Sequence, residues 1–140
     1  MAAKKRDAPT IGSATLPLNQ KLTFSFEYYA SLSDEYCLSK FSQEQVQRAM
    51  HRLKEINGKT FNDLIQQQTV YHFKPVPWEK TTKPKGFENK ALEALEPYHF
   101  ALLGVNGQLA RVFGAYSSGI FYVVWFDLEH KIWPSVLKHT

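Results

Sequence analysis

The stretch that decides the fold is residues 98–134, which read YHFALLGVNGQLARVFGAYSSGIFYVVWFDLEHKIWP. It holds three apolar runs of strand length, rich in Val, Phe, Tyr and Trp, with turns at 106–107 and 117–119 between them. Such runs joined by glycine-bearing turns predict a three-stranded antiparallel meander. The last run, 120–126, has almost no polar interruption, so we expect a central strand that is covered on both faces and flanked by two antiparallel partners.

A strand and two helices are predicted upstream of the meander. Residues 22–30 begin with alternating apolar and polar side chains, which predicts a half-buried strand. The best-marked helix follows, because Ser42 can cap its first turn and Gln45 three residues later completes a capping box. Gly58 is a typical stop for that helix, and a second short helix is expected to begin at Thr60.

The segment between the helices and the meander carries several prolines and lysines, so residues 74–86 are predicted to form a long loop. A loop of this length inside a compact domain is more often functional or mobile than inert. The predicted fold is an α+β domain with an N-terminal strand, two helices, the long Pro/Lys loop and the C-terminal three-stranded antiparallel meander, with the helices packed on one face. We expect a single domain over 21–140, preceded by a flexible basic tail over 1–20.

The composition indicates the cellular compartment in which the chain is expected. The chain has 140 residues, a net charge of +4 and one cysteine, Cys37, so an intramolecular disulfide is excluded and a reducing compartment is expected. No apolar run approaches the roughly 18 residues of a membrane span. The basic residues at 4–6 are followed by Asp-Ala-Pro-Thr and not by the apolar core of a secretory signal. We therefore predict a cytoplasmic protein without a membrane partner.

The mildly basic charge permits an anionic partner such as RNA. Basic side chains concentrate on the predicted outer surface of the first helix and in the proline-rich loop, where an aromatic ring beside lysines can stack on a base. The candidate nucleic-acid contacts are Arg48, Arg52, Lys74, Trp78, Lys83 and Lys85. Solubility alone is the other explanation for the charged runs.

Several chemistries lack the residues that they need. No glycine-rich phosphate loop of a common spacing is present, which argues against nucleoside-triphosphate and dinucleotide binding. The lone cysteine and the scattered histidines give no metal-ligand spacing, so neither a metal nor another cofactor is expected. Asp127 and Glu129 would alternate onto different sides of a continuing strand, which gives a glycosidase no support.

Charged residues within and after the meander are the candidates for catalysis. Arg111 stands among apolar residues of the middle strand, so its permanent charge must meet solvent, a carboxylate such as Asp127, or an anionic ligand. An ion pair and a phosphate clamp both stay open. His130 follows the last strand and can move a proton near neutral pH, but it also fits an exposed turn. Tyr98 and His99 begin the meander at the same end of the sheet.

The segments LARVF and FYVVWFDLEHK, preceded by two helices, resemble the RelE/ParE superfamily of bacterial toxins. That superfamily pairs two helices with a small curved antiparallel sheet, and many of its members cut messenger RNA on the ribosome. The resemblance covers about residues 42–134. It implies that Arg111 binds phosphate and that His130 transfers protons. Tyr98 or Lys131 would assist.

Three functions stay open on the sequence alone. The first is a messenger-RNA endonuclease toxin, and the second is a non-catalytic toxin that blocks a target protein; the resemblance implies a cognate antitoxin for either. The third is a phage or plasmid protein on the same scaffold without toxicity. Residues 20–24, with Gln20 and Phe24, have the spacing of peptides that bind the bacterial replication clamp, although Phe24 fits better in the core of a strand.

Overall fold

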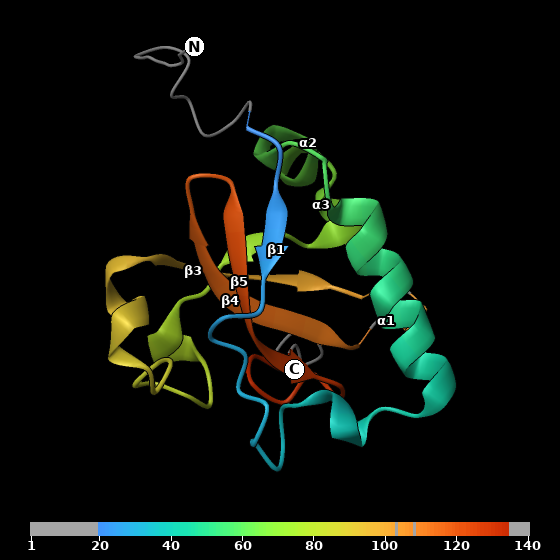
Figure 1. The fold of residues 1–140 in the computed structure, drawn as a ribbon. Helices are drawn as coiled ribbons and strands as arrows, with labels where there is room; N and C mark the ends of the chain where they lie inside the picture. The colour runs from blue at the N-terminus through green and yellow to red at the C-terminus, as the bar shows by residue number, and fades with distance from the viewer. Residues whose placement is uncertain (1–19, 103, 108, 135–140) are drawn as a thin grey trace.

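The computed structural model describes residues 20–102, 104–107 and 109–134, so the predicted tail lies outside the described residues apart from Gln20. Its centre is a five-stranded mixed sheet in the order β1-β5-β4-β3-β2 (Figure 1). The strands are β1 (Thr23–Ser25), β2 (Lys74–Pro75), β3 (Glu96–Ala101), β4 (Arg111–Ser117) and β5 (Ile120–Asp127). The α-helices are α1 (Gln43–Ile56), α2 (Phe61–Gln66) and α3 (Gln68–Tyr71). Short 3₁₀ turns are η3 (Leu38–Lys40), η4 (Trp78–Lys80) and η5 (Lys90–Ala94).

The α+β class is confirmed, but the antiparallel meander of β3, β4 and β5 is part of a larger sheet. β5 lies between antiparallel β4 and parallel β1, so the expectation of two antiparallel partners is wrong on one side. The helices after β1 carry the chain across to the opposite edge, where β2 pairs with β3. β1 is shorter than the predicted strand over 22–30. In the segment between β1 and α1, two further backbone hydrogen bonds reach β5: Ala30 N–H to the Val124 carbonyl (3.0 Å) and Phe126 N–H to the Tyr36 carbonyl (2.8 Å).

The predicted capping box of α1 is confirmed. The Ser42 hydroxyl accepts from the Gln45 N–H at 3.1 Å, and the Gln45 side chain accepts from the Ser42 N–H at 2.9 Å. These two bonds satisfy donors that the first turn of a helix leaves without partners. The helix ends at Ile56, two residues before Gly58, whose φ of +95° suits a glycine.

Two apolar cores hold the sheet, one on each face. The helices cover one face, where Leu22, Leu53, Ile56 and Phe121 are buried. The chain between β2 and β3, together with the residues after β5, covers the other face, on which Phe113 and Trp125 pack. Figure 1 shows the helices along one side of the sheet and the segment from η4 to η5 on the other. The long loop predicted over 74–86 is thus a covering layer, and it contributes β2 and η4.

β5 is the strand on which both cores converge. Val123 belongs to the core under the helices, and Val124 and Trp125 belong to the core on the opposite face. All three are buried, as the uninterrupted apolar run predicted. Within the described part of the chain, no helix has the length and apolar character to cross a membrane.

Gly114 has no room for a side chain. It lies at the irregularity of the β4–β5 ladder, and a Cβ atom there would overlap the carbonyl oxygen of Tyr122 and the ring of Phe121. We expect Gly114→Ala to lower the free energy of unfolding by about 3 kcal/mol, because the obstacle includes rigid backbone. Gly107→Ala, at φ +67° in an open turn, is the control and should lose only about 1 kcal/mol. Urea unfolding measures both, and equal losses would contradict the close β4–β5 contact.

Candidate functional site

His99 and four other side chains that can carry positive charge lie near one another, and β3 directs His99 to the sheet face opposite the helices. We call this set the basic cluster; it consists of His72, Lys74, His99, Arg111 and His130. Lys74 of β2 is opposite His99 of β3 in the sheet register, and Ala101 of β3 is opposite Arg111 of β4. His72 and His130 lie just outside the strands, and both have positive φ angles, 51° and 60°. Strand pairing therefore brings together residues that are up to 58 positions apart (130 − 72).

His99 is the most buried member of the cluster. It is 4% exposed, and neither of its ring nitrogens has a hydrogen-bond partner among the described residues. Its ring stacks on Phe113 with a centroid distance of 5.1 Å and lies 5.0 Å from the ring of Trp133. Burial, and then the positive charges of the other four cluster members, lower the pKa of His99 to about 3. His99 is therefore neutral at physiological pH.

Arg111 and Asp127 face each other across β4 and β5. Arg111 is 8% exposed, and its Nη1 donates to the Ala110 carbonyl at 3.2 Å. Burial lowers the pKa of Arg111, and the negative charge of Asp127 opposes that shift. The ion-pair alternative that the sequence left open for Arg111 thus has a carboxylate in the right place.

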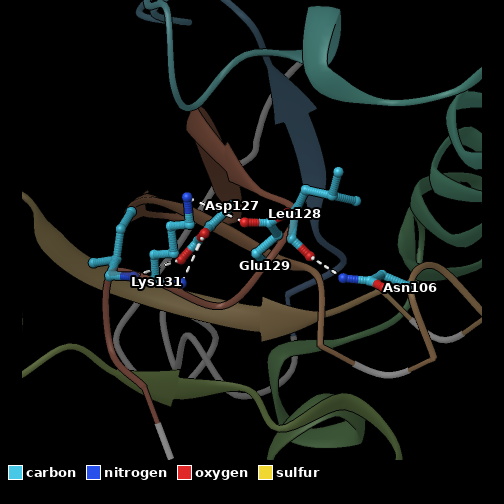
Figure 2. Close-up of polar contacts among 6 residues, drawn as sticks. Asn106, Asp127, Leu128, Glu129 and Lys131 are labelled. Carbon is cyan, nitrogen blue, oxygen red and sulfur yellow. Dashed lines mark hydrogen bonds and ion pairs between the residues drawn. The ribbon is translucent and has the colours of Figure 1, made fainter.

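Asp127 also fixes the chain that follows β5. Its carboxylate accepts from the Lys131 N–H at 2.9 Å and from the Ile132 N–H at 2.7 Å. Burial raises the pKa of Asp127, while these two hydrogen bonds and then Arg111 act in the opposite direction. Figure 2 shows the carboxylate directed at the Lys131 backbone, and Asn106 donating to the Leu128 carbonyl at 3.1 Å on the other side. The turn that carries His130 is therefore held from two sides.

The other two predicted catalytic residues lie elsewhere. Tyr98 is directed to the helix-covered face, where its ring stacks on Phe73 at 4.8 Å and meets Phe61 edge-on at 5.5 Å. Lys131 is exposed, and its Nζ pairs with Glu129 at 3.1 Å. The structure brings Arg111 and His130 together with His99 and leaves Tyr98 on the opposite side of the sheet.

The predicted nucleic-acid contacts divide into exposed and packed side chains. Arg48 is exposed but pairs with Glu44 at 3.1 Å, so its charge is largely offset. Arg52 was expected on the outer surface of the helix, and this is wrong. It is 7% exposed, lies over the Tyr71 ring at 5.2 Å, and pairs with Glu55 at 3.1 Å. The aliphatic stem of an arginine allows such burial.

The loop residues on that list also differ among themselves. Lys74 and Lys85 are exposed. Lys83 is half-buried, with its ammonium group 5.2 Å and 5.6 Å from the ring centroids of Tyr36 and Trp125. Trp78 is half-buried and packs edge-on against Trp125, so much of its ring belongs to the core.

The sequence analysis did not place His72 or Lys74 at one site with the other members of the cluster. Lys74 was predicted only as a nucleic-acid contact in the proline-rich loop. His72 was one of the scattered histidines whose spacing did not indicate a site. No local pattern links them, because His72 ends α3 in the left-handed conformation and β2 begins only at Lys74. The pairing of β2 with β3 places Lys74 opposite His99.

Comparison of the chain with protein-family models, with curated proteins and with solved structures found no match. Among the described residues, no group of three or more His, Cys, Asp or Glu side chains could hold a metal ion. Fold and site therefore define a small α+β protein with a basic cluster in which His99, Arg111 and His130 are buried and Lys74 is exposed.

The lowered pKa of His99 predicts a loss of stability in acid. Unfolded His99 titrates near 6.5, so below that pH the unfolded chain takes up a proton that the folded chain excludes until about pH 3. The free energy of unfolding should therefore fall as the pH drops through this window, by up to roughly 1.4 kcal/mol per pH unit from this residue. Urea titrations at pH 7, 6 and 5 measure the slope.

His99→Phe should flatten that slope, because phenylalanine can fill the space between Phe113 and Trp133 without titrating. The matched control is His51→Phe on the exposed side of α1, which should leave the slope unchanged. An acid slope that persists in His99→Phe would assign the effect to other groups.

Proposed function

We propose that this chain is the toxin of a bacterial toxin–antitoxin pair and that it acts on RNA, whose phosphate backbone binds at the basic cluster. The observation that supports this proposal is the cluster itself: four residues that can bear positive charge lie around His99, and Asp127 lies opposite one of them, Arg111. The positive charges of Lys74 and Arg111 attract phosphate, and the guanidinium of Arg111 matches phosphate oxygens in a fork. Lys74 is exposed and gives the cluster an outward side from which a strand can approach.

The arrangement of elements supports the toxin class. Three α-helices, where two were expected, follow the first strand and lie on one face of a small sheet, with Arg111 in the next-to-last strand and His130 after the last. Apart from the third helix, this is the arrangement that the resemblance to RelE/ParE toxins implies. A cognate antitoxin and the ribosome are the partners that follow from it.

Cleavage would use the ribose next to the bound phosphate. The 2′-oxygen attacks phosphorus as its proton passes to a base, the bond from phosphorus to the 5′-oxygen breaks, and an acid protonates that leaving oxygen. His99 would accept the first proton once the bound phosphate offsets the cations that lower its pKa, and His130 would supply the second. Arg111 offsets the charge that develops on the phosphate. RNA would have to displace the side chains that cover the cluster, Trp133 among them.

A non-catalytic toxin that blocks a target protein is the second candidate. The burial of Arg111 and His130, at 8% and 7% exposure, favours it, because substrate must reach a catalytic group. The segment 20–24 does not support the replication clamp as that target. Phe24 packs against Phe100 and Phe121 at centroid distances of 6.0 and 5.8 Å and is not presented as a free peptide.

Primer extension on a message translated with purified protein distinguishes the two candidates. The wild type should create new RNA ends, and Arg111→Ala or His130→Ala should reduce the cleavage rate by roughly 10²- to 10⁴-fold. Arg111→Lys should restore only part of it, since a lysine cannot form the bidentate fork. Lys54→Ala removes an exposed cation on α1, is the control, and should cleave normally. Arrest of translation or replication without new ends would favour the blocking toxin.

The toxin class has its own test in cells. Overproduction of the chain alone should arrest growth, and co-expression of the neighbouring antitoxin gene should relieve the arrest and raise solubility. Normal growth of cells that accumulate folded protein would contradict any toxin assignment.

Binding of RNA should depend on Lys74 more than on other exposed lysines. We expect Lys74→Glu to weaken binding of a short single-stranded RNA and to reduce the dependence of log K on log salt concentration by about one. Lys54→Glu makes the same charge change on the exposed surface of α1 and is the control. Fluorescence anisotropy at several salt concentrations gives both slopes. Equal effects of the two substitutions would indicate a general charge effect and no site at the cluster.

A further inference from the structure

A small cavity lies beside the basic cluster, between η4, η5 and the start of β3. Its volume is about 230 Å³. Trp78, Phe87, Leu92 and Pro97 give it an apolar lining, and Lys85 is among the polar residues on it. Pockets for drug-sized ligands span roughly 300–1,000 Å³. The cavity therefore suits one flat ring system with a charged or polar attachment.

Trp78 gives the cavity a fixed aromatic surface. Its ring packs edge-on against Phe87 at 4.9 Å and Trp125 at 6.1 Å, which holds the indole in place. Gly86 lies next to the indole with φ +76°, and a Cβ atom at this position would lie 3.2 Å from the Trp78 Nε1. The absence of a side chain at Gly86 therefore leaves space beside the indole.

β3 links the cavity to the basic cluster. Pro97 lines the cavity, and His99 is the next residue of β3 on the same face, because alternate side chains of a strand share a face. Two residues along a strand span roughly 7 Å. That distance is within the reach of a single nucleotide from its base to its phosphate.

We propose that this cavity binds a nucleobase of the RNA strand whose phosphate lies at the basic cluster, an inference that rests on the proposed function. An aromatic wall stacks on any base, and such stacking contributes roughly 1–3 kcal/mol per base, which favours a base over an aliphatic side chain. Lys85 on the cavity lining suits the phosphate on the other side of the same nucleotide, and the carboxylate of Glu93 on the same lining is paired with Lys90 at 3.2 Å.

The test compares two glycine variants and two kinds of RNA probe. Gly86→Ala puts a methyl group against Trp78, whereas Gly58→Ala has similar backbone strain at φ +95° with nothing within 4 Å. The probes are a tetrauridine RNA and the same RNA with the base removed from one ribose at a time. Leu95→Phe, at a half-buried position of the lining, fills the cavity without backbone strain and covers the case in which Gly86→Ala fails to fold.

We expect one abasic position to bind the wild type at least about 5-fold more weakly than the intact RNA, which is the lower end of the stacking range. Gly86→Ala and Leu95→Phe should weaken the binding of intact RNA by the same factor. In these variants, removal of that base should weaken binding no further. Gly58→Ala should behave as the wild type.

Equal binding of intact and abasic RNA, with Lys74→Glu still weakening both, would overturn the nucleobase site and leave the proposed function standing. Absence of RNA binding in the wild type would overturn both. Tight binding of a peptide by the cavity, lost in Gly86→Ala without effect on RNA, would replace the nucleobase with a protein partner.

Discussion

The rest of the structure depends on shielding both faces of β5 from water. A strand without polar alternation cannot lie at a solvated face, so it needs a covering layer on each side. The helices form one layer over Phe121 and Val123. No second pair of helices exists in the described chain, and the other layer is assembled from three separate pieces: the connection between β1 and α1 with Tyr36, the proline-rich segment before β3, and the turn after β5. The residues of this second layer determine which polar side chains can lie on that face of the sheet.

Asp127 has two roles in that second layer. Its carboxylate binds the N–H groups of Lys131 and Ile132, which turns the chain back so that Ile132 is buried against the sheet. The same carboxylate lies opposite Arg111 and offsets part of its charge. A buried charge that loses its partner costs several kcal/mol, so these two roles are coupled. The fold of the covering turn and the presence of a buried arginine therefore depend on one side chain.

Local signals in the sequence predicted local structure. The capping box at Ser42 and Gln45 was readable because all its atoms lie within one turn of chain. The parallel pairing of β1 with β5 was not, because it joins residues almost 100 positions apart and a three-residue strand has little pattern of its own. Arg52 was misplaced for a different reason: its charge indicated solvent, but its stem and ring contact with Tyr71 place it inside. The order of the meander strands predicted that His99 lies at the end of the sheet where His130 follows the last strand, but the pairing of β2 with β3, which places Lys74 opposite His99, was not predicted.

His99 is the residue that the fold itself does not require. Its neighbours are the aromatic rings of Phe113 and Trp133, among which a phenylalanine would pack without an unsatisfied nitrogen. A buried polar group without a hydrogen bond lowers stability, and such exceptions are concentrated at functional sites. A bound phosphate would reverse the electrostatic part of the cost, because it offsets the cations that lower the pKa of His99. Binding of an anion would then raise that pKa toward the range in which a histidine exchanges protons, so the protonation of His99 and the occupation of the basic cluster are thermodynamically linked.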